Sequence, residues 1–183
     1  MLLANAKTIE DLLDRSLEEE LGPFCNLSAE LLFKDEQRAE ASLFALDEGI
    51  LAGGKLIEPT IRKLDPEGQV LKLLPEGTPL NDGRYFCSLR ASLKALLSCE
   101  RVLLLFLTRL SAIASTTAAF CKKIKNFPQV GISGGRFGTA GMEVLESYAI
   151  RLGGGRLRNF SALDSLVIEK SHQRSMGGMT AAV

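Results

Sequence analysis

Apolar residues repeat at helical spacing through one long stretch in the second half of the chain. They occupy positions 102, 103, 106, 107, 110, 113, 114, 117, 121 and 124. A repeat of three or four residues predicts a single helix over about 98–126. Its first turns are apolar on nearly every side, which is typical of a helix that other elements surround. We therefore expect this helix to be the central element of the fold.

The segment before this helix carries signals for both helices and strands. A helix is predicted from Thr8, a possible N-cap, to about Gly22-Pro23. Residues 24–32 are interpreted as a loop that leads into a short apolar turn. Alternating apolar and polar residues predict a strand over 39–46. A second helix is expected over about 55–64.

Two turn signals then introduce two further strands. Asp65-Pro66-Glu67-Gly68 precedes a strand predicted over about 69–74, and Asn81-Asp82-Gly83 precedes one predicted over about 84–90. The order helix, strand, helix, strand, strand favours a small α+β domain with a mostly antiparallel sheet over residues 1–97.

The pattern changes after the long helix. Short apolar segments at 130–133 and 166–168 predict strands, and residues 142–152 predict a helix between them. Alternation of short strands and helices is typical of a parallel α/β layer, which we assign to residues 98–183. We expect 130–134 and 166–169 to be neighbouring parallel strands.

Composition limits the classes of partner. The chain has 183 residues, 46% of them apolar, which is enough for one large or two small packed domains. It carries 22 basic and 22 acidic residues and no Trp, so we expect no nucleic-acid partner. The four cysteines form no Cys-x-x-Cys pair and the single histidine is His172, which argues against a structural zinc site.

The sequence also predicts where the protein is located in the cell. The apolar run 102–107 lies between Arg101 and Arg109 and is far shorter than the roughly 20 residues of a membrane span. The N-terminus shows no secretory signal. We therefore expect a cytoplasmic protein with reduced thiols and no membrane partner.

Two glycine-rich turns carry the best candidates for an anion-binding site. Gly131-Ile132-Ser133-Gly134-Gly135 leads to Arg136, and Gly153-Gly154-Gly155 leads to Arg156 and Arg158. The same residues can also have a purely structural role. The three glycines can simply end the preceding helix, and the two later arginines can lie on a solvated strand face.

Two further residues and one motif also have two readings. Arg101 can bind an anion or pair with Glu100 or another neighbour, and His172 can be a loop or core residue. Residues 131–135 spell G-x-S-x-G, with Asp164 and His172 following in the order of a serine hydrolase. That enzyme class needs a multi-stranded sheet before the serine, whereas a long helix is predicted there.

Several motifs together resemble the quinolinate phosphoribosyltransferase family. They are Glu100-Arg101-x-x-Leu104-x-Phe106-Leu107-x-Arg109-Leu110-Ser111-x-Ile113-Ala114-x-Thr116, Leu145-Glu146-x-Tyr148-Ala149-Ile150-x-x-Gly153-Gly154-Gly155, Gly49-Ile50-x-Ala52-Gly53 and Asp164-x-x-Val167-Ile168-x-x-x-His172. The resemblance implies an N-terminal α/β domain followed by an α/β barrel. It also implies that quinolinate and phosphoribosyl pyrophosphate give nicotinate mononucleotide, carbon dioxide and pyrophosphate, a step of NAD biosynthesis.

The resemblance further implies partners and a site. Relatives of this kind act as homodimers whose active sites are lined by both chains, and Mg²⁺ accompanies the reaction. The substrate-binding candidates in this sequence are Arg101, Arg136, Arg156, Arg158 and His172. A related branch of the family is associated with molybdate transport and remains a second possibility.

This sequence departs from the family pattern where the pattern places cations. Phe137 and Glu169 replace family lysines, Glu143 replaces an arginine, and Leu105 replaces an asparagine. A complete barrel takes about 250 residues, so we expect an incomplete barrel with an open strand edge. We expect the metal and ribose ligands of the family to lie beyond residue 183. Both points predict weak or absent transferase activity, or a decayed member of the family that acts by binding.

Overall fold

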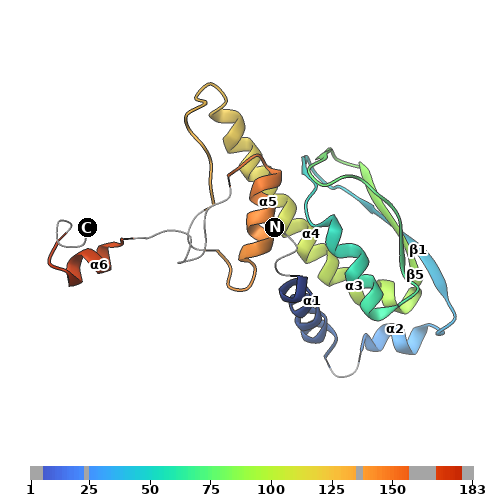
Figure 1. The fold of residues 1–183 in the computed structure, drawn as a ribbon. Helices are drawn as coiled ribbons and strands as arrows, with labels where there is room; N and C mark the ends of the chain where they lie inside the picture. The colour runs from blue at the N-terminus through green and yellow to red at the C-terminus, as the bar shows by residue number, and fades with distance from the viewer. Residues whose placement is uncertain (1–5, 23–24, 135–137, 157–167, 179–183) are drawn as a thin grey trace.

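The computed structural model describes residues 6–22, 25–134, 138–156 and 168–178. Figure 1 shows the elements along the chain. They are α1 (Ala6–Leu21), α2 (Leu27–Leu32), β1 (Arg38–Phe44), β2 (Gly49–Ile50), the 3-10 turn η3 (Gly54–Leu56), α3 (Ile57–Leu64), β3 (Gln69–Leu73), β4 (Pro79–Leu80), β5 (Tyr85–Ser92), α4 (Leu93–Lys123), α5 (Glu143–Leu152) and α6 (Lys170–Ser175).

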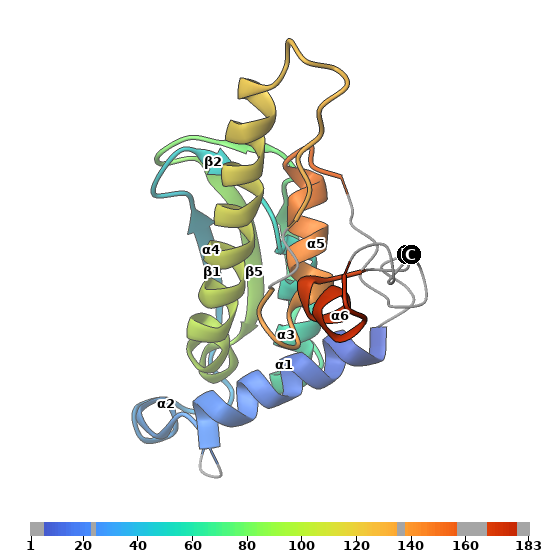
Figure 2. The same ribbon diagram turned by 90° about the vertical axis from the view of Figure 1, so that its left-hand side faces the viewer.

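The predicted central helix is α4. It begins five residues before the predicted start because the Ser92 hydroxyl accepts the Ala95 N–H at 3.2 Å and caps the helix. The helix contacts α1, α2, α3, α5 and the sheet strands β1 and β5. Figures 1 and 2 show it running between the sheet and the layer formed by α1 and α5. Its buried side chains, from Ala95 to Thr117, form the middle of the core.

The sheet is antiparallel, as predicted. Its strand order is β1-β5-β3, and β2 pairs separately with β4. Residues in β1 alternate between exposed and partly buried, as expected for a strand with one face on the core. The turn at Asn81 is also present, where the Arg84 N–H donates to the Asn81 carbonyl at 3.0 Å.

Two predictions for this half are wrong. Thr8 lies inside α1, which already includes Ala6, so it is not the N-cap of that helix. Residues 27–32 form the helix α2 and not a loop. The Asn26 side chain accepts the Ala29 N–H at 3.1 Å and donates to the Leu97 carbonyl of α4 at 3.2 Å. The second of these bonds spans distant parts of the chain, so it could not be read from local sequence.

The later half matches the predictions only in part. The helix expected at 142–152 is α5, but 130–133 is not a regular strand. One parallel bridge joins Ser133 to Arg156, and the Arg156 N–H donates to the Ile132 carbonyl at 2.7 Å. The expected partner 166–169 lies partly outside the described residues, and its last two residues are not in a strand.

The long helix also bears on two other expectations. The predicted domain boundary at residue 97 falls within the first turns of α4, which serves both halves of the chain. By length and composition, α4 is the one helix in the described ranges that could cross a membrane. This test covers all of α4, whereas the run considered in the sequence was 102–107. In this fold α4 contacts several other elements, and 39% of the apolar window that meets this criterion is buried.

Candidate functional site

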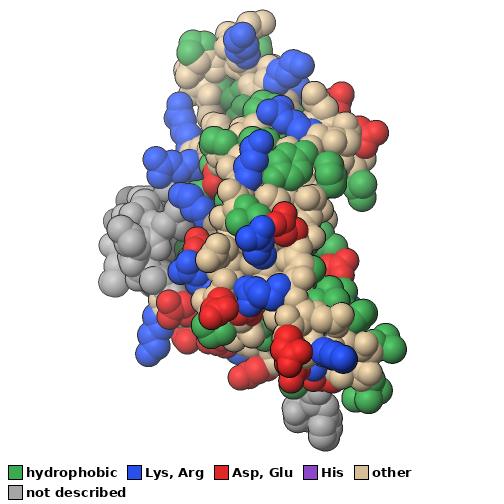
Figure 3. All heavy atoms as spheres, turned by 90° about the vertical axis from the view of Figure 1, so that its right-hand side faces the viewer, with side chains coloured by type: hydrophobic (Ala, Val, Ile, Leu, Met, Phe, Trp, Pro, Cys, Tyr) green, Lys and Arg blue, Asp and Glu red, His purple; other side chains and the backbone are tan. Residues whose placement is uncertain are grey.

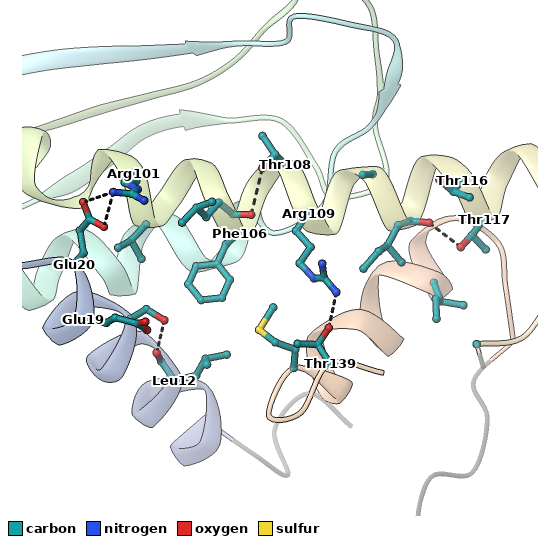
Figure 4. A pocket seen from close by; sticks show the side chains of 18 of the residues that line it. Leu12, Glu19, Glu20, Arg101, Phe106, Thr108, Arg109, Thr116, Thr117 and Thr139 are labelled. Atoms are coloured by element: carbon teal, nitrogen blue, oxygen red, sulfur yellow. Dashed lines mark hydrogen bonds and ion pairs between the residues drawn. The ribbon is translucent and has the colours of Figure 1, made fainter. Parts of the chain in front are cut away.

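A groove follows one side of α4. It lies between α1 and α5, has a volume of about 1500 Å³, and reaches the segment Ile132–Gly134. Figure 4 shows that α1, α4, α5 and the loop before α5 supply the side chains around it. Apolar residues such as Phe106 and Met142 line it together with Arg101 and Arg109. A concave, mostly apolar lining with a few polar groups makes it the candidate binding groove among the described residues.

Arg101 lies near the start of this groove, where an exposed turn of α4 faces α1. Its side chain is 72% exposed and forms an ion pair with Glu20 of α1, at 3.4 Å between Nη1 and Oε2. Figure 4 shows the two side chains reaching toward one another. The neighbour that pairs with Arg101 is thus Glu20 and not Glu100. Any anion that binds Arg101 in this conformation must compete with that carboxylate.

A second arginine of the groove was present in the motifs but was given no role. Arg109 donates from Nε at 3.2 Å and from Nη2 at 2.6 Å to one carboxylate oxygen of Glu146 in α5. Its Nη2 also donates to the Thr139 hydroxyl at 2.5 Å. The other Glu146 oxygen accepts the Thr139 N–H at 3.1 Å. These bonds fix α4, α5 and the loop before α5 to one another.

The environment of Glu146 explains its charge state. Burial acts to raise the pKa of Glu146, but the hydrogen bonds and positive charge of Arg109, with those from Thr139, lower the pKa overall. Glu146 is therefore ionised at neutral pH. One signal for the contact between Arg109 and Glu146 was present in the sequence: both residues belong to the motifs quoted above, Arg109 on α4 and Glu146 on the helix that follows it.

The charges in the groove nearly cancel. Glu19, Glu20 and Glu146 face Arg101 and Arg109 within it or at its edge. Glu143, which we expected to oppose substrate binding, is exposed and is not among the groove residues. The opposing negative charge therefore comes from α1 and from Glu146.

Of the predicted arginines, the structure describes Arg101 and Arg156, which lie far apart. Arg156 shares a small hollow with Cys121 of α4, twenty residues after Arg101. At 1.5 Å per residue, Arg101 and Arg156 are separated by roughly 30 Å along the helix. Arg136 and Arg158 lie outside the described residues. Within one chain, Arg101 and Arg156 cannot touch the same small ligand.

His172 lies in α6, which stands apart from the other elements in Figure 1. The side chain is exposed, and its Nδ1 accepts the Glu169 N–H at 3.0 Å, which caps this short helix. Ser133 is bridged to Arg156, and its side chain has no hydrogen bond to His172 in the described ranges. Asp164 is outside those ranges, so the hydrolase reading gains no support.

The three glycines after α5 have a packing role. A Cβ atom on Gly153 would lie 2.3 Å from the Ala114 carbonyl oxygen, and one on Gly155 would lie 2.9 Å from the Thr117 methyl. Gly154 has a φ of 86°, a conformation that favours glycine. These contacts support the structural reading of this turn, in which α5 ends while pressed against α4.

Metal binding has no candidate among the described residues. They include no group of three or more His, Cys, Asp or Glu side chains placed to hold an ion.

Comparison with known proteins identifies the same family in both halves of the chain. Residues 26–111 match the family described as quinolinate phosphoribosyl transferase, N-terminal domain, and residues 113–183 match its C-terminal domain. A probable nicotinate-nucleotide pyrophosphorylase [carboxylating] of Bacillus subtilis is 33% identical over 178 residues, 97% of this chain and 61% of its own length. A protein with the same description from Synechocystis is 30% identical over 148 residues, 81% of this chain and 50% of its own length.

Solved structures agree. A crystal structure of NadC from Streptococcus pyogenes matches with a TM-score of 0.87 and 30% identity, over 95% of this chain and 62% of that chain. A nicotinate-nucleotide pyrophosphorylase from Francisella tularensis matches with a TM-score of 0.85 and 25% identity, over 96% of this chain and 61% of that chain. The fold is therefore the α/β fold of these proteins, and the chain spans half to three fifths of the length of these relatives.

Proposed function

Because the chain belongs to the quinolinate phosphoribosyltransferase family, we propose that its function lies in NAD biosynthesis, in phosphoribosyl transfer from phosphoribosyl pyrophosphate to quinolinate. The observation that carries this proposal is the match to both family domains over residues 26–183, together with the NadC-like fold. The products would be nicotinate mononucleotide, carbon dioxide and pyrophosphate.

Quinolinate is a planar dicarboxylate, and its recognition needs cations with directed N–H donors. An arginine can hold one carboxylate through two parallel hydrogen bonds. Arg101 is the best described candidate, because it is exposed at the groove and its pair with Glu20 is long at 3.4 Å. Arg136, Arg156, Arg158 and His172 remain candidates for the second carboxylate and the phosphates.

The separation of Arg101 from Arg156 favours a site that is shared between two copies of the chain. We propose a homodimer in which Arg101 of one subunit completes the site of the other. The exposed leucines of α4 support an interface beside Arg101, since Leu104 is 40% and Leu105 59% exposed there. An exposed apolar stripe on a central helix costs solubility unless another surface covers it.

We propose that the isolated chain has weak transferase activity or none. Phe137 and Glu169 stand where the family has lysines, and Glu20 and Glu146 neutralise the groove arginines. Loss of one preorganised charged contact can cost about 10²-fold in rate. Binding of a pyridine carboxylate without turnover is the second candidate, and a relative that serves molybdate transport is the third. For any of them we propose a cytoplasmic location.

The test combines binding with turnover. Calorimetry with quinolinate measures affinity, and an assay with quinolinate, phosphoribosyl pyrophosphate and Mg²⁺ follows nicotinate mononucleotide. We expect millimolar binding that Arg101→Ala and Arg136→Ala each weaken at least about tenfold, as expected for loss of a charged hydrogen bond. Arg90→Ala is the matched control, because Arg90 is an exposed arginine on the sheet that pairs with Glu40.

The outcomes separate the candidates. Turnover near 1 s⁻¹, within the ordinary enzyme range, would show an active transferase and disprove the predicted impairment. Binding without turnover supports the second candidate. No binding of quinolinate at millimolar concentration, with Arg90→Ala and the wild-type chain equally inert, would overturn the proposed substrate.

A further inference from the structure

The last turns of α4 and the loop after them extend beyond the rest of the described fold. Figures 1 and 2 show this end in two perpendicular views, and in both it projects past the sheet and α5. We call this end the basic tip. It consists of Phe120, Lys122, Lys123, Lys125, Phe127 and Val130.

The basic tip exposes large apolar side chains. Phe120 is 51% exposed, Phe127 55% and Val130 46%. Two successive turns hold the loop in shape, with the Phe127 N–H donating to Ile124 and the Val130 N–H donating to Phe127. A projecting segment that presents apolar groups to water at its far end is better suited to an external surface than to the core.

Among the described residues, the lysines of the basic tip and the neighbouring Arg156 show no acidic partner. In the described ranges, the side chains of Lys122, Lys125 and Arg156 make no ion pair, and the Lys123 ammonium lies 5.8 Å from the centre of the Phe120 ring. Lys94 shows the contrast, because it is bound by both Glu30 and Asp35. The positive charge at the tip is therefore available to an external anion.

The chain as a whole separates its charges. Residues 1–100 carry 18 acidic and 11 basic residues, whereas residues 101–183 carry four acidic and 11 basic residues. A net charge of zero conceals this asymmetry, which is typical of proteins that approach anionic surfaces. Figure 3 shows Lys and Arg side chains at the projecting end.

Apolar and cationic groups share one surface there. Lys125, Phe127, Val130 and Arg156 line the same shallow hollow of about 230 Å³. The Arg156 side chain packs closely against Gly131, where an added Cβ atom would lie 2.7 Å from the Arg156 Nε. Arg156 therefore lines the hollow together with Phe127 and Val130.

We propose that the basic tip binds the surface of an anionic phospholipid membrane. Phenylalanine and valine enter the boundary between headgroups and acyl chains, and the cations contact lipid phosphates and carboxylates. A single-stranded nucleic acid would also attract the lysines and stack bases on Phe120 and Phe127, so an oligonucleotide is the competing ligand in the test below. The expectation of no membrane partner considered spanning segments only, and this peripheral mode differs from it.

The chain offers a direct reporter because it contains no Trp. The variant Phe127→Trp places a single indole at the tip. We expect its emission to shift to shorter wavelength with vesicles of phosphatidylcholine containing about 30% phosphatidylserine, and not with phosphatidylcholine alone. Salt at about 0.5 M should reverse the shift. The matched control is Leu31→Trp on α2, an apolar side chain that is 77% exposed at the acidic end of the molecule.

A second variant tests the charges. Lys122, Lys123 and Lys125 changed together to Gln in the Phe127→Trp background should weaken vesicle binding about 100-fold, from about 1 kcal/mol for each lysine. Unchanged circular dichroism would show that the variant folds, because these lysines can also stabilise the C-terminus of α4. No shift with anionic vesicles, an equal shift for Leu31→Trp, or binding to a single-stranded oligonucleotide without vesicle binding would each overturn the proposal.

Discussion

Ser111 of α4 forms two hydrogen bonds with the backbone of Ala52. Its hydroxyl accepts the Ala52 N–H at 3.1 Å and donates to the Ala52 carbonyl at 3.2 Å. One turn later, the Ser115 hydroxyl accepts the Ile50 N–H at 2.8 Å. The two serine hydroxyls therefore satisfy backbone groups of a buried segment. In the described strands, pairing ends at Ile50, so Ala52 has no strand partner. This explains why Ser111 and Ser115 stand on the side of α4 that contacts residues 50–52.

We predict that Ser111→Ala lowers the free energy of unfolding by about 1–3 kcal/mol, because Ala52 is fully buried and would lose its partner. Ser147→Ala is the control, since the Ser147 hydroxyl bonds only the Glu143 carbonyl on an exposed helix face. Its effect should stay within about 0.5 kcal/mol. Urea denaturation measures both, and equal effects would contradict the role given to Ser111.

Asp65 joins three elements at the start of α4. Its carboxylate accepts the Ser92 N–H at 2.8 Å and the Glu67 N–H at 3.0 Å, and pairs with Arg38 at 3.1 Å. Burial acts to raise the pKa of Asp65, but these hydrogen bonds and the Arg38 charge lower the pKa below its ordinary value of 3.8. A lowered folded pKa stabilises the fold above the unfolded pKa, and this is lost as pH falls through the folded pKa.

We therefore predict that Asp65→Asn destabilises the protein by about 1–3 kcal/mol at pH 7. The difference from the wild type should shrink as the pH falls below about 4, where the carboxylate becomes protonated. Thermal unfolding from pH 7 to pH 3 checks this. Asp82→Asn, in an exposed turn, should follow the wild type throughout. A constant difference at every pH would contradict the electrostatic explanation.

The pair of Arg109 and Glu146 should show coupling between α4 and α5. The Glu146 side chain is 12% exposed and Arg109 is 51% exposed. A double-mutant cycle of Arg109→Gln and Glu146→Gln should give a coupling energy of about 1–2 kcal/mol. The exposed pair Arg90 and Glu40 is the control and should give less than about 1 kcal/mol. If both cycles give the same value, the Glu146 contact does not join the two helices.

Gly153 should not tolerate a side chain. A Cβ atom there would lie 2.3 Å from a backbone oxygen of α4, which cannot move without shifting the helix. We predict that Gly153→Ala costs about 3 kcal/mol through overpacking. At Gly177 an added Cβ would meet nothing within 4 Å, so Gly177→Ala should cost about 1 kcal/mol through its positive φ of 85°. Comparable losses in thermal unfolding would favour a backbone explanation over packing.

The proposed dimer predicts a change of mass. Replacing Leu104 and Leu105 with Ser should convert the protein to a monomer in light scattering, because these side chains supply exposed apolar area on α4. Replacing Leu31 and Leu32 of α2 with Ser is the control, since these leucines are exposed but are not on α4. A dimer that survives the α4 variant, or a wild-type monomer, would disprove this interface.

Local pattern was sufficient wherever an element's stability comes from its own periodicity. The antiparallel strands β1, β3 and β5 and the helices α1, α4 and α5 could be predicted because their apolar residues repeat at the period of the element. The family, too, could be recognised, from a set of motifs on α4 and α5, at 49–53 and at 164–172. The helix α2 could not, because its Asn26 cap is held by Leu97, far along the chain.

The site depends on contacts between distant segments. Nothing near Arg101 in the sequence indicates Glu20, and nothing near Arg109 indicates Glu146 or Thr139, because these carboxylates and hydroxyls arrive from other helices. The sequence determined which residues carry charge and that the helices α1, α4 and α5 form. Only the tertiary structure decided which charges meet, which remain available at the tip of α4, and how far apart the arginines lie, because distances between helices follow from packing and not from the order of residues.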